Sequence, residues 1–174
     1  MTNAKVIDAD EVAKSLDFAG SEYVKEIANL FGEGILNEAG SLNRKKLGDI
    51  IYTDVHSKSE LDKITFKYVG GEVLRRIENC KSNEDIDYIV LDVPLLFESE
   101  LNVSCDVVIS VTASQNTKIE RIQLRDNITE ETAQKRLAIQ KDEDFYYRNS
   151  DFVIENNGDK DLMQNSIERI LKEI

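Results

Sequence analysis

The stretch Tyr88-Ile89-Val90-Leu91-Asp92-Val93 decides the fold class of this chain. It is an almost unbroken apolar run, which is typical of a strand that is buried on both faces of a parallel sheet. A second run of this kind covers Val107–Thr112, and shorter β-branched runs cover Lys5–Ile7 and Phe152–Glu155. These four runs predict the strands.

Helical patterns separate the predicted strands. They cover, in chain order, Glu22–Phe31 after Ser21, a long stretch from the capping-box pattern Ser57–Glu60 toward Cys80, Ser114 through Arg125, Thr129 through Gln140, and about Asp161 to the end. Strands that alternate with helices indicate βαβ units. The sequence therefore predicts an α/β fold with a doubly wound, mostly parallel sheet.

Length and charge exclude several classes of function. The 174 residues fit one domain. Acidic residues outnumber basic ones by 34 to 22, which argues against nucleic acid as a partner and weakly against anionic membranes. No apolar stretch reaches the roughly 18 residues of a membrane helix, and the first residues lack the apolar core of a signal peptide. Two cysteines without a CxxC pattern and a single histidine fit a cytoplasmic protein without a histidine-based zinc site.

The net charge of −12 is unevenly distributed. Residues 118–148 hold seven basic and seven acidic side chains, so the remaining 15 basic and 27 acidic residues carry the whole excess. Four of the eight arginines lie in this neutral segment, at positions 121, 125, 136 and 148. Two solvated amphipathic helices would explain the pattern, and composition alone favours them. The alternative is an arginine-bearing lid over a phosphorylated ligand, because guanidinium groups match phosphate oxygens.

Carboxylates follow two of the predicted strands, at the edge where open α/β sheets bind ligands. The first strand runs into Asp8-Ala9-Asp10, whose carboxylates could act as a general base or as partners of magnesium. Either could instead cap the helix that starts near Glu11. Asp92 resembles the aspartate that holds Mg²⁺ in phosphate-transferring sheets, although a buried aspartate bonded to backbone would look the same.

The phosphate-binding pattern G-x-x-x-x-G-K-[ST] is absent from these residues. Such sheets normally cradle phosphates with the backbone amides of that loop. The chain has eight glycines, and a lysine follows none of them.

Several segments together resemble the dephospho-CoA kinase family. They are, in chain order, VIDAD at Val6–Asp10, Phe31-Gly32, GSLNR at Gly40–Arg44, VPLLFE at Val93–Glu98, Arg121 with Arg125-Asp126, Arg136 with Gln140, and Asp151 to Gly158. The resemblance covers nearly the whole chain in the family's order. It implies a P-loop kinase that phosphorylates the ribose 3′-hydroxyl of dephospho-CoA with ATP and Mg²⁺, the last step of coenzyme A biosynthesis.

The resemblance also implies roles for individual residues. Asp10 would be the base that faces the substrate hydroxyl, and Arg136 would reach the ATP phosphates from the lid. Asp8 and the VPLLFE segment would line the dephospho-CoA site, that is, Pro94, Leu95, Leu96, Phe97 and Glu98. Arg121 and Arg125 would support the lid, and Asn156 and Gly158 would lie near adenine.

The implied regions follow the same order along a single domain. Residues 1–20 and 88–116 would form the core, 21–87 the substrate-binding helical region and 117–150 the lid. Residues 151–174 would add the last strand and helix of the core.

Two departures from the family affect these expectations. In the family a strand, a phosphate loop and a helix precede VIDAD, whereas five residues precede it here, so we expect the first strand, the P-loop and the first helix to be missing. The missing strand is central to the family's sheet, and unpaired buried backbone groups cost about 1–3 kcal/mol each. The sheet would therefore pair differently, take a strand from a partner or a second copy, or open a cleft. The second departure is Phe66-Lys67 at the usual His-Pro position, which His56 does not replace.

Three functions fit these observations. The first is an incomplete dephospho-CoA kinase with little or no activity of its own, which the retained Asp10, Arg136 and VPLLFE favour. The second is a pseudokinase that binds dephospho-CoA, CoA or a partner protein, which the changed residues at 66 and 67 favour. The third is a non-catalytic assembly protein that offers a sheet edge to a partner strand.

Overall fold

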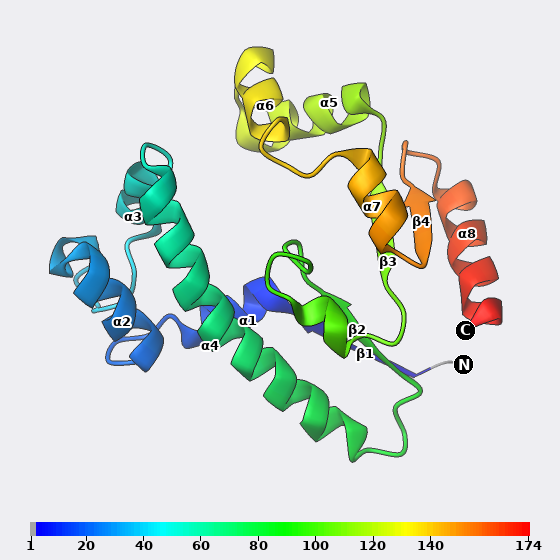
Figure 1. Cartoon of the computed structure of the whole chain (residues 1–174), viewed down its shortest axis with the longest axis horizontal. Coiled ribbons are helices and arrows are strands. Elements are labelled where there is room, and N and C mark those ends of the chain that lie inside the picture. The colour runs from blue at the N-terminus through cyan, green and yellow to red at the C-terminus, as the bar shows by residue number, and fades with distance from the viewer. Residues whose placement is uncertain (1–2) are drawn as a thin grey trace. The chain divides into compact units, whose positions relative to one another are not determined.

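The four strands lie where the apolar runs predict them. The computed structural model describes residues 3–174, and Figure 1 shows its elements in chain order. The strands are β1 (Ala4–Asp8), β2 (Tyr88–Asp92), β3 (Ile109–Thr112) and β4 (Phe152–Glu155). Each begins and ends within two residues of its predicted bounds. Met1 and Thr2, which open the expected core region, lie outside the described residues.

Helices occupy most of the remaining chain. They are α1 (Ala9–Leu16), α2 (Glu22–Phe31), α3 (Arg44–Ile51), α4 (Val55–Lys81), α5 (Gln115–Asp126), α6 (Glu130–Leu137), α7 (Glu143–Asn149) and α8 (Lys160–Glu173), with short 3₁₀ turns at Glu33–Ile35 and Leu101–Ser104. Ser21, Ser114 and Thr129 cap α2, α5 and α6 as the sequence predicts. The α6 helix ends at Leu137, three residues before the predicted end.

The chain divides into two compact units, one up to Leu101 and one from Asn102 on. Each unit contains one two-stranded parallel sheet. In the first unit β1 pairs with β2, and in the second β3 pairs with β4. The prediction of one doubly wound sheet is therefore wrong in this respect for the described residues, because β2 and β3 belong to different sheets. Each strand instead forms backbone hydrogen bonds with a single parallel partner, along one of its two edges.

Both sheets leave apolar strand residues exposed, which corrects the expectation of burial on both faces. Ile7 lies opposite Leu91 and turns toward the core, whereas Val6 and Val90, one position earlier, are 58% and 46% exposed. Val111 of β3 is 63% exposed. Successive side chains of a strand point to opposite faces. In the β1–β2 sheet, the face that carries Ile7 and Leu91 therefore lies against the core, and the face that carries Val6 and Val90 does not.

The long helix α4 carries the core of the first unit. Its N-terminal half packs Leu61 and Ile64 against a cluster that includes Ile27 of α2. Its C-terminal half packs Val69, Val73 and Ile77 against Ile7 of β1 and Val12 of α1, and Leu101 belongs to the same cluster. The same helix thus holds the α2–α3 region and the β1–β2 sheet.

The start of α4 corrects the capping-box prediction. The helix begins at Val55, and the Asp54 carboxylate accepts hydrogen bonds from the backbone N–H groups of His56 (3.0 Å) and Ser57 (3.1 Å). Ser57 donates its hydroxyl to the same carboxylate. An ionised carboxylate is a stronger acceptor than a serine hydroxyl and also favours the positive end of the helix dipole.

Truncation of Ile27 should show how much the α2–α4 contact stabilises the first unit. Ile27 is fully buried, so Ile27→Ala should lower the free energy of unfolding by about 2–5 kcal/mol. Leu30→Ala on the same helix is the matched control, because Leu30 is 46% exposed. Urea denaturation would measure both. Equal losses for the two variants would contradict the described packing.

Replacement of Asp54 should destabilise α4 more than replacement of Ser57, which would be the N-cap of the predicted capping box. Hydrogen bonds from Ser57 lower the pKa of Asp54 below its usual 3.8. A carboxyl group with a lowered pKa stabilises the fold above that value, and the stabilisation disappears as the pH falls through the lowered pKa. The Asp54→Ala variant should thus unfold at lower urea than the wild type at neutral pH, and the difference should close in acid. A larger loss for Ser57→Ala than for Asp54→Ala would restore the capping-box start.

Candidate functional site

Two carboxylates meet at the carboxyl end of the β1–β2 sheet. The parallel register places Asp8 opposite Asp92, on the last rung of the ladder. By alternation both belong to the exposed face that carries Val6 and Val90. This is the edge where open α/β sheets bind ligands.

Asp8 and Asp10 have different roles in the local structure. Asp8 caps α1, since its Oδ1 accepts hydrogen bonds from the N–H groups of Asp10 (2.7 Å) and Glu11 (3.1 Å). Asp10 lies in the first turn and is exposed. The cap fixes the turn between β1 and α1, so the position of Asp10 relative to the strand end follows from the Asp8 carboxylate.

The loop after β2 is held by two buried anchors. Leu96 packs against the second core cluster, and Leu101 is buried in it. The Leu101 N–H donates to the Leu96 carbonyl (3.2 Å), which closes the loop between them. Pro94, Leu95 and Glu98 are exposed, whereas Phe97 is half-buried. The predicted substrate-lining segment is therefore a short loop with a fixed base and an exposed rim.

The GSLNR segment is tied to the end of α1 by Asp17. The Asp17 carboxylate accepts hydrogen bonds from the Leu42 N–H (2.8 Å) and from Arg44 Nη2 (3.1 Å). Gly40 has φ +77°, and a Cβ there would lie 3.0 Å from the Cβ of Ala19. Only glycine suits this turn, because its backbone conformation is left-handed and the turn approaches Ala19 closely.

The Phe66-Lys67 position carries a tie between α4 and α2. Lys67 Nζ donates to Glu26 Oε2 (2.6 Å), and Tyr68 donates its hydroxyl to the same oxygen (2.7 Å). These two bonds lower the pKa of Glu26. The charge at position 67 is thus paired inside the first unit, and His56 lies exposed in the first turn of α4.

In the second unit two of the arginines predicted to belong to a lid converge on one carboxylate. Arg125 donates to Asp126 through Nε (2.7 Å) and Nη2 (2.9 Å), and Arg136 Nη1 donates to Asp126 Oδ2. Asp126 ends α5 and Arg136 lies in the last turn of α6, so the carboxylate joins the two helices. The hydrogen bonds from Arg125, with the charge of Arg136 beside them, hold the pKa of Asp126 below its usual range.

The segment after β4 meets the start and the middle of α5. Arg121 Nη2 donates to Asn156 Oδ1 (3.3 Å), which joins a predicted lid residue to a predicted nucleotide-binding residue. The Ser114 N–H donates to Asn157 Oδ1 (2.7 Å). Gly158 follows with φ +106°.

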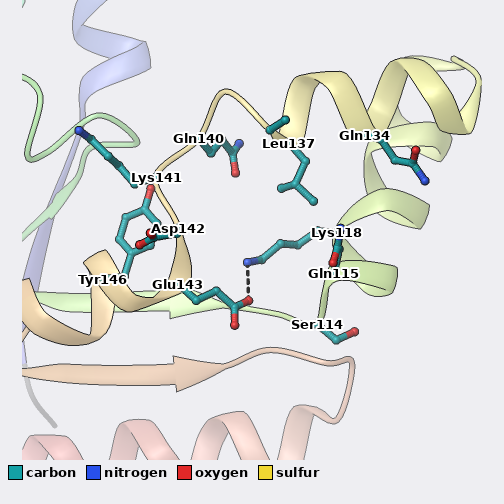
Figure 2. Close-up of a pocket in the computed structure, with 11 residues that line it drawn as sticks. Ser114, Gln115, Lys118, Gln134, Leu137, Gln140, Lys141, Asp142, Glu143 and Tyr146 are labelled. Atoms are coloured by element: carbon teal, nitrogen blue, oxygen red, sulfur yellow. Dashed lines mark hydrogen bonds and ion pairs between the residues drawn. The ribbon is translucent and has the colours of Figure 1, made fainter.

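A cavity of about 480 Å³ lies inside the second unit (Figure 2). Its wall comes from α5, α6, the connection after α6, and α7. Lys118 reaches across it and donates to Glu143 Oε1 (2.9 Å), and this ion pair lowers the pKa of Glu143. None of the predicted site residues lines this cavity.

Within residues 3–174 no three histidine, cysteine or acidic side chains come together as a metal site. No helix of this part of the chain has the length and apolar character needed to cross a membrane.

A sequence model of the family described as "Dephospho-CoA kinase" matches residues 2–161. The chain belongs to the dephospho-CoA kinase family. The dephospho-CoA kinase of Listeria monocytogenes serotype 4b is 36% identical over 168 residues, which are 96% of this chain and 83% of that protein. The one from Syntrophotalea carbinolica is 34% identical over 155 residues, which are 89% of this chain and 73% of the relative.

Solved structures agree with this assignment. The dephospho-CoA kinase from Campylobacter jejuni matches with a TM-score of 0.68 and 26% identity, over 97% of this chain and 84% of that chain. TT1252 from Thermus thermophilus matches with a TM-score of 0.74 over 98% of this chain and 85% of that chain. At 23% identity the second match supports the fold alone.

Sequence reasoning missed the cavity of this dephospho-CoA kinase family member. Its wall needs α7, and the sequence analysis did not predict that helix. The signal is present, because Asp142 caps α7 by accepting a hydrogen bond from the Phe145 N–H (2.7 Å). An aspartate three residues before an aromatic pair is a helix start that periodicity alone overlooks in a helix of seven residues.

Replacement of Asp126 should loosen the pairing of α5 with α6. Asp126→Asn removes the charge that two arginines share, so backbone amides of α6 should exchange with deuterium faster than in the wild type. Asp144→Asn is the matched control, because Asp144 pairs only with Arg148 one turn away on the exposed surface of α7. If Asp144→Asn speeds exchange in α6 as much as Asp126→Asn, the carboxylate does not join the helices.

Proposed function

We propose that this chain supplies the acceptor and lid parts of a dephospho-CoA kinase. The reaction transfers the γ-phosphoryl group of ATP to the ribose 3′-hydroxyl of dephospho-CoA. The observation that carries the proposal is the carboxylate edge of the β1–β2 sheet, with Asp8 opposite Asp92 and Asp10 on the adjoining helix turn, within a chain whose family match covers residues 2–161.

Asp10 is proposed as the general base of the transfer. An exposed carboxylate in the first turn of α1 can accept a proton from a hydroxyl that approaches the sheet edge. The Asp8 cap supports this role, because it fixes the turn and leaves Asp10 on the ligand side. The exposed rim of the loop at 94–98 would then contact the acceptor beside that hydroxyl.

Arg136 is proposed to reach the ATP phosphates. It shares Asp126 with Arg125, so two guanidinium groups surround one carboxylate and the cluster carries a net positive charge. A phosphate could accept further N–H groups of such a cluster. Arg121, through Asn156, would place the segment around Gly158 beside the nucleotide.

Magnesium would fit the carboxylate edge as an ion that the protein shares with the phosphates of the substrate. Mg²⁺ commonly binds one or two carboxylates together with phosphates of the substrate, and Asp8 and Asp92 would supply those two. When bound, the ion would neutralise charge that develops on the phosphates. Asp8 already accepts two backbone hydrogen bonds, which orient its carboxylate at the strand end.

The phosphate-binding loop is proposed to come from a segment outside these 174 residues. They contain no G-x-x-x-x-G-K-[ST] pattern, and positioning of the phosphates supplies most of the catalysis in phosphoryl transfer. The exposed valines Val6 and Val90 support this view, because an added strand-and-helix segment would cover an apolar face of this kind. A partner strand or a second copy could supply it as well.

Binding of dephospho-CoA without catalysis is the second candidate function. The observation that favours it is the Phe66-Lys67 pair at the usual His-Pro position, where Phe66 replaces the histidine to which the family resemblance assigns a substrate contact and Lys67 is paired with Glu26. A chain that has lost this contact and the phosphate loop would keep at most the binding surface.

A coupled ADP-release assay tests the proposal on two proteins. One is the 174-residue chain, and the other is the same chain preceded by the N-terminal segment of the Listeria monocytogenes relative. We expect no significant turnover from the first and kinase turnover from the second. In the active protein Asp10→Asn should lower turnover by roughly 10²–10⁴-fold, as expected for loss of a general base.

Glu11→Gln is the matched control, because Glu11 is the neighbouring exposed carboxylate of the same helix turn. Its turnover should equal that of the parent protein. Ordinary kinase turnover by the 174-residue chain would overturn the proposal that the phosphate-binding loop comes from another segment. A folded but inactive fusion that still binds dephospho-CoA would favour the second candidate.

A further inference from the structure

The cavity of the second unit is large enough for a small ligand. Its 480 Å³ lie within the usual range of small-molecule pockets, which is about 300–1,000 Å³. Its wall mixes the apolar groups of Leu137 and Ala138 with the polar groups of Ser114, Gln115 and Gln140. The question is which chemical class of ligand this wall would recognise.

The charged groups of the wall are engaged within the protein. Lys118 Nζ donates to Glu143, whose Oε1 also accepts a longer hydrogen bond from Thr112 Oγ1 (3.4 Å). Asp142 caps α7. Lys141 Nζ lies 5.0 Å from the centre of the Phe145 ring, in a cation–π contact. Two lysines and two acids thus balance, and a phosphate in the cavity would have to displace Glu143 and face the Asp142 carboxylate.

The remaining wall suits a flat, uncharged group. Figure 2 shows Leu137 and the Gln140 amide directed toward the Lys118–Glu143 pair, with Tyr146 on the same wall. A glutamine amide presents one donor and one acceptor side by side, which matches the N6 and N7 edge of adenine. Aliphatic and aromatic side chains such as Leu137 and Tyr146 can cover the faces of a purine ring.

We propose that this cavity binds a purine base, with Gln140 reading the edge of adenine. The identity of the molecule that brings the base rests on the proposed function, in which ATP and dephospho-CoA both carry adenine. The binding itself does not depend on phosphoryl transfer. Asn156 and Gly158, which the family resemblance places near adenine, do not line the cavity, although Ser114 of its wall donates its N–H to Asn157. The proposal therefore predicts an adenine contact beyond those two residues.

The test is a nuclear magnetic resonance titration of the full ¹⁵N-labelled chain with adenosine. We expect saturable shifts of backbone amides at positions 115, 118 and 140–143. The Gln140→Leu variant should weaken adenosine binding roughly tenfold, as expected for loss of a paired donor and acceptor. Ala138→Phe should abolish binding by filling the cavity. Circular dichroism would verify that both variants fold.

Gln164→Leu is the matched control, because Gln164 is an exposed glutamine on α8 away from the cavity. Adenosine should bind this variant as it binds the wild type. Three outcomes would overturn the proposal: no shifts with adenosine, shifts confined to positions 156–158 that Gln140→Leu leaves unchanged, or shifts of the cavity amides with pyrophosphate but not with adenosine.

Competition identifies the source of the base. Whichever of ATP and dephospho-CoA displaces adenosine from the cavity at the lower concentration supplies it, and displacement by neither would overturn the assignment of adenine. If the fused protein binds adenosine but transfers no phosphoryl group, the proposed kinase function is contradicted and the proposed purine site is still supported.

Discussion

Parallel pairing of β1 with β2 fixes which side chains of the sheet face the core and which lie on its exposed face. The register sets Ile7 and Leu91 against the core cluster and Asp8 opposite Asp92 at the carboxyl end. A slip by one residue would turn the carboxylates toward the core and the core residues toward water. The placement of Asp10, the cap of α1 and the loop after β2 all depend on this register.

The α4 helix keeps that sheet in place. It contacts β1 and α1 through Val69, Val73 and Ile77, and the α2–α3 region through Leu61 and Ile64. One rigid helix of 27 residues can therefore connect the carboxylate edge with the helical region expected to hold the acceptor. The Lys67–Glu26 and Tyr68–Glu26 bonds add a polar tie along the same helix.

Local patterns predicted the elements, whereas tertiary contacts decided the details that the sequence analysis missed. The β-branched runs placed all four strands, and Ser21 and Gly32 placed both ends of α2. The start of α4 was misplaced because the serine of a capping box and the Asp54 carboxylate compete as caps only three residues apart. Apolar runs do not reveal how many faces are covered, so Val90 and Val111 were expected to be buried. The cavity depends on Lys118 and Glu143, which are 25 residues apart and show no sequence pattern that links them.

Recognition of the acceptor and binding of the phosphates depend on different parts of the proposed enzyme. The carboxylate edge, the loop at 94–98 and the arginines around Asp126 are present in these residues, and the phosphate-binding loop pattern is not. Titration calorimetry of the 174-residue chain with dephospho-CoA and with ATP tests this separation most directly. The account predicts saturable binding of dephospho-CoA and binding of ATP that is weaker by roughly tenfold or more. Equal binding of ATP, or no binding of dephospho-CoA, would contradict it.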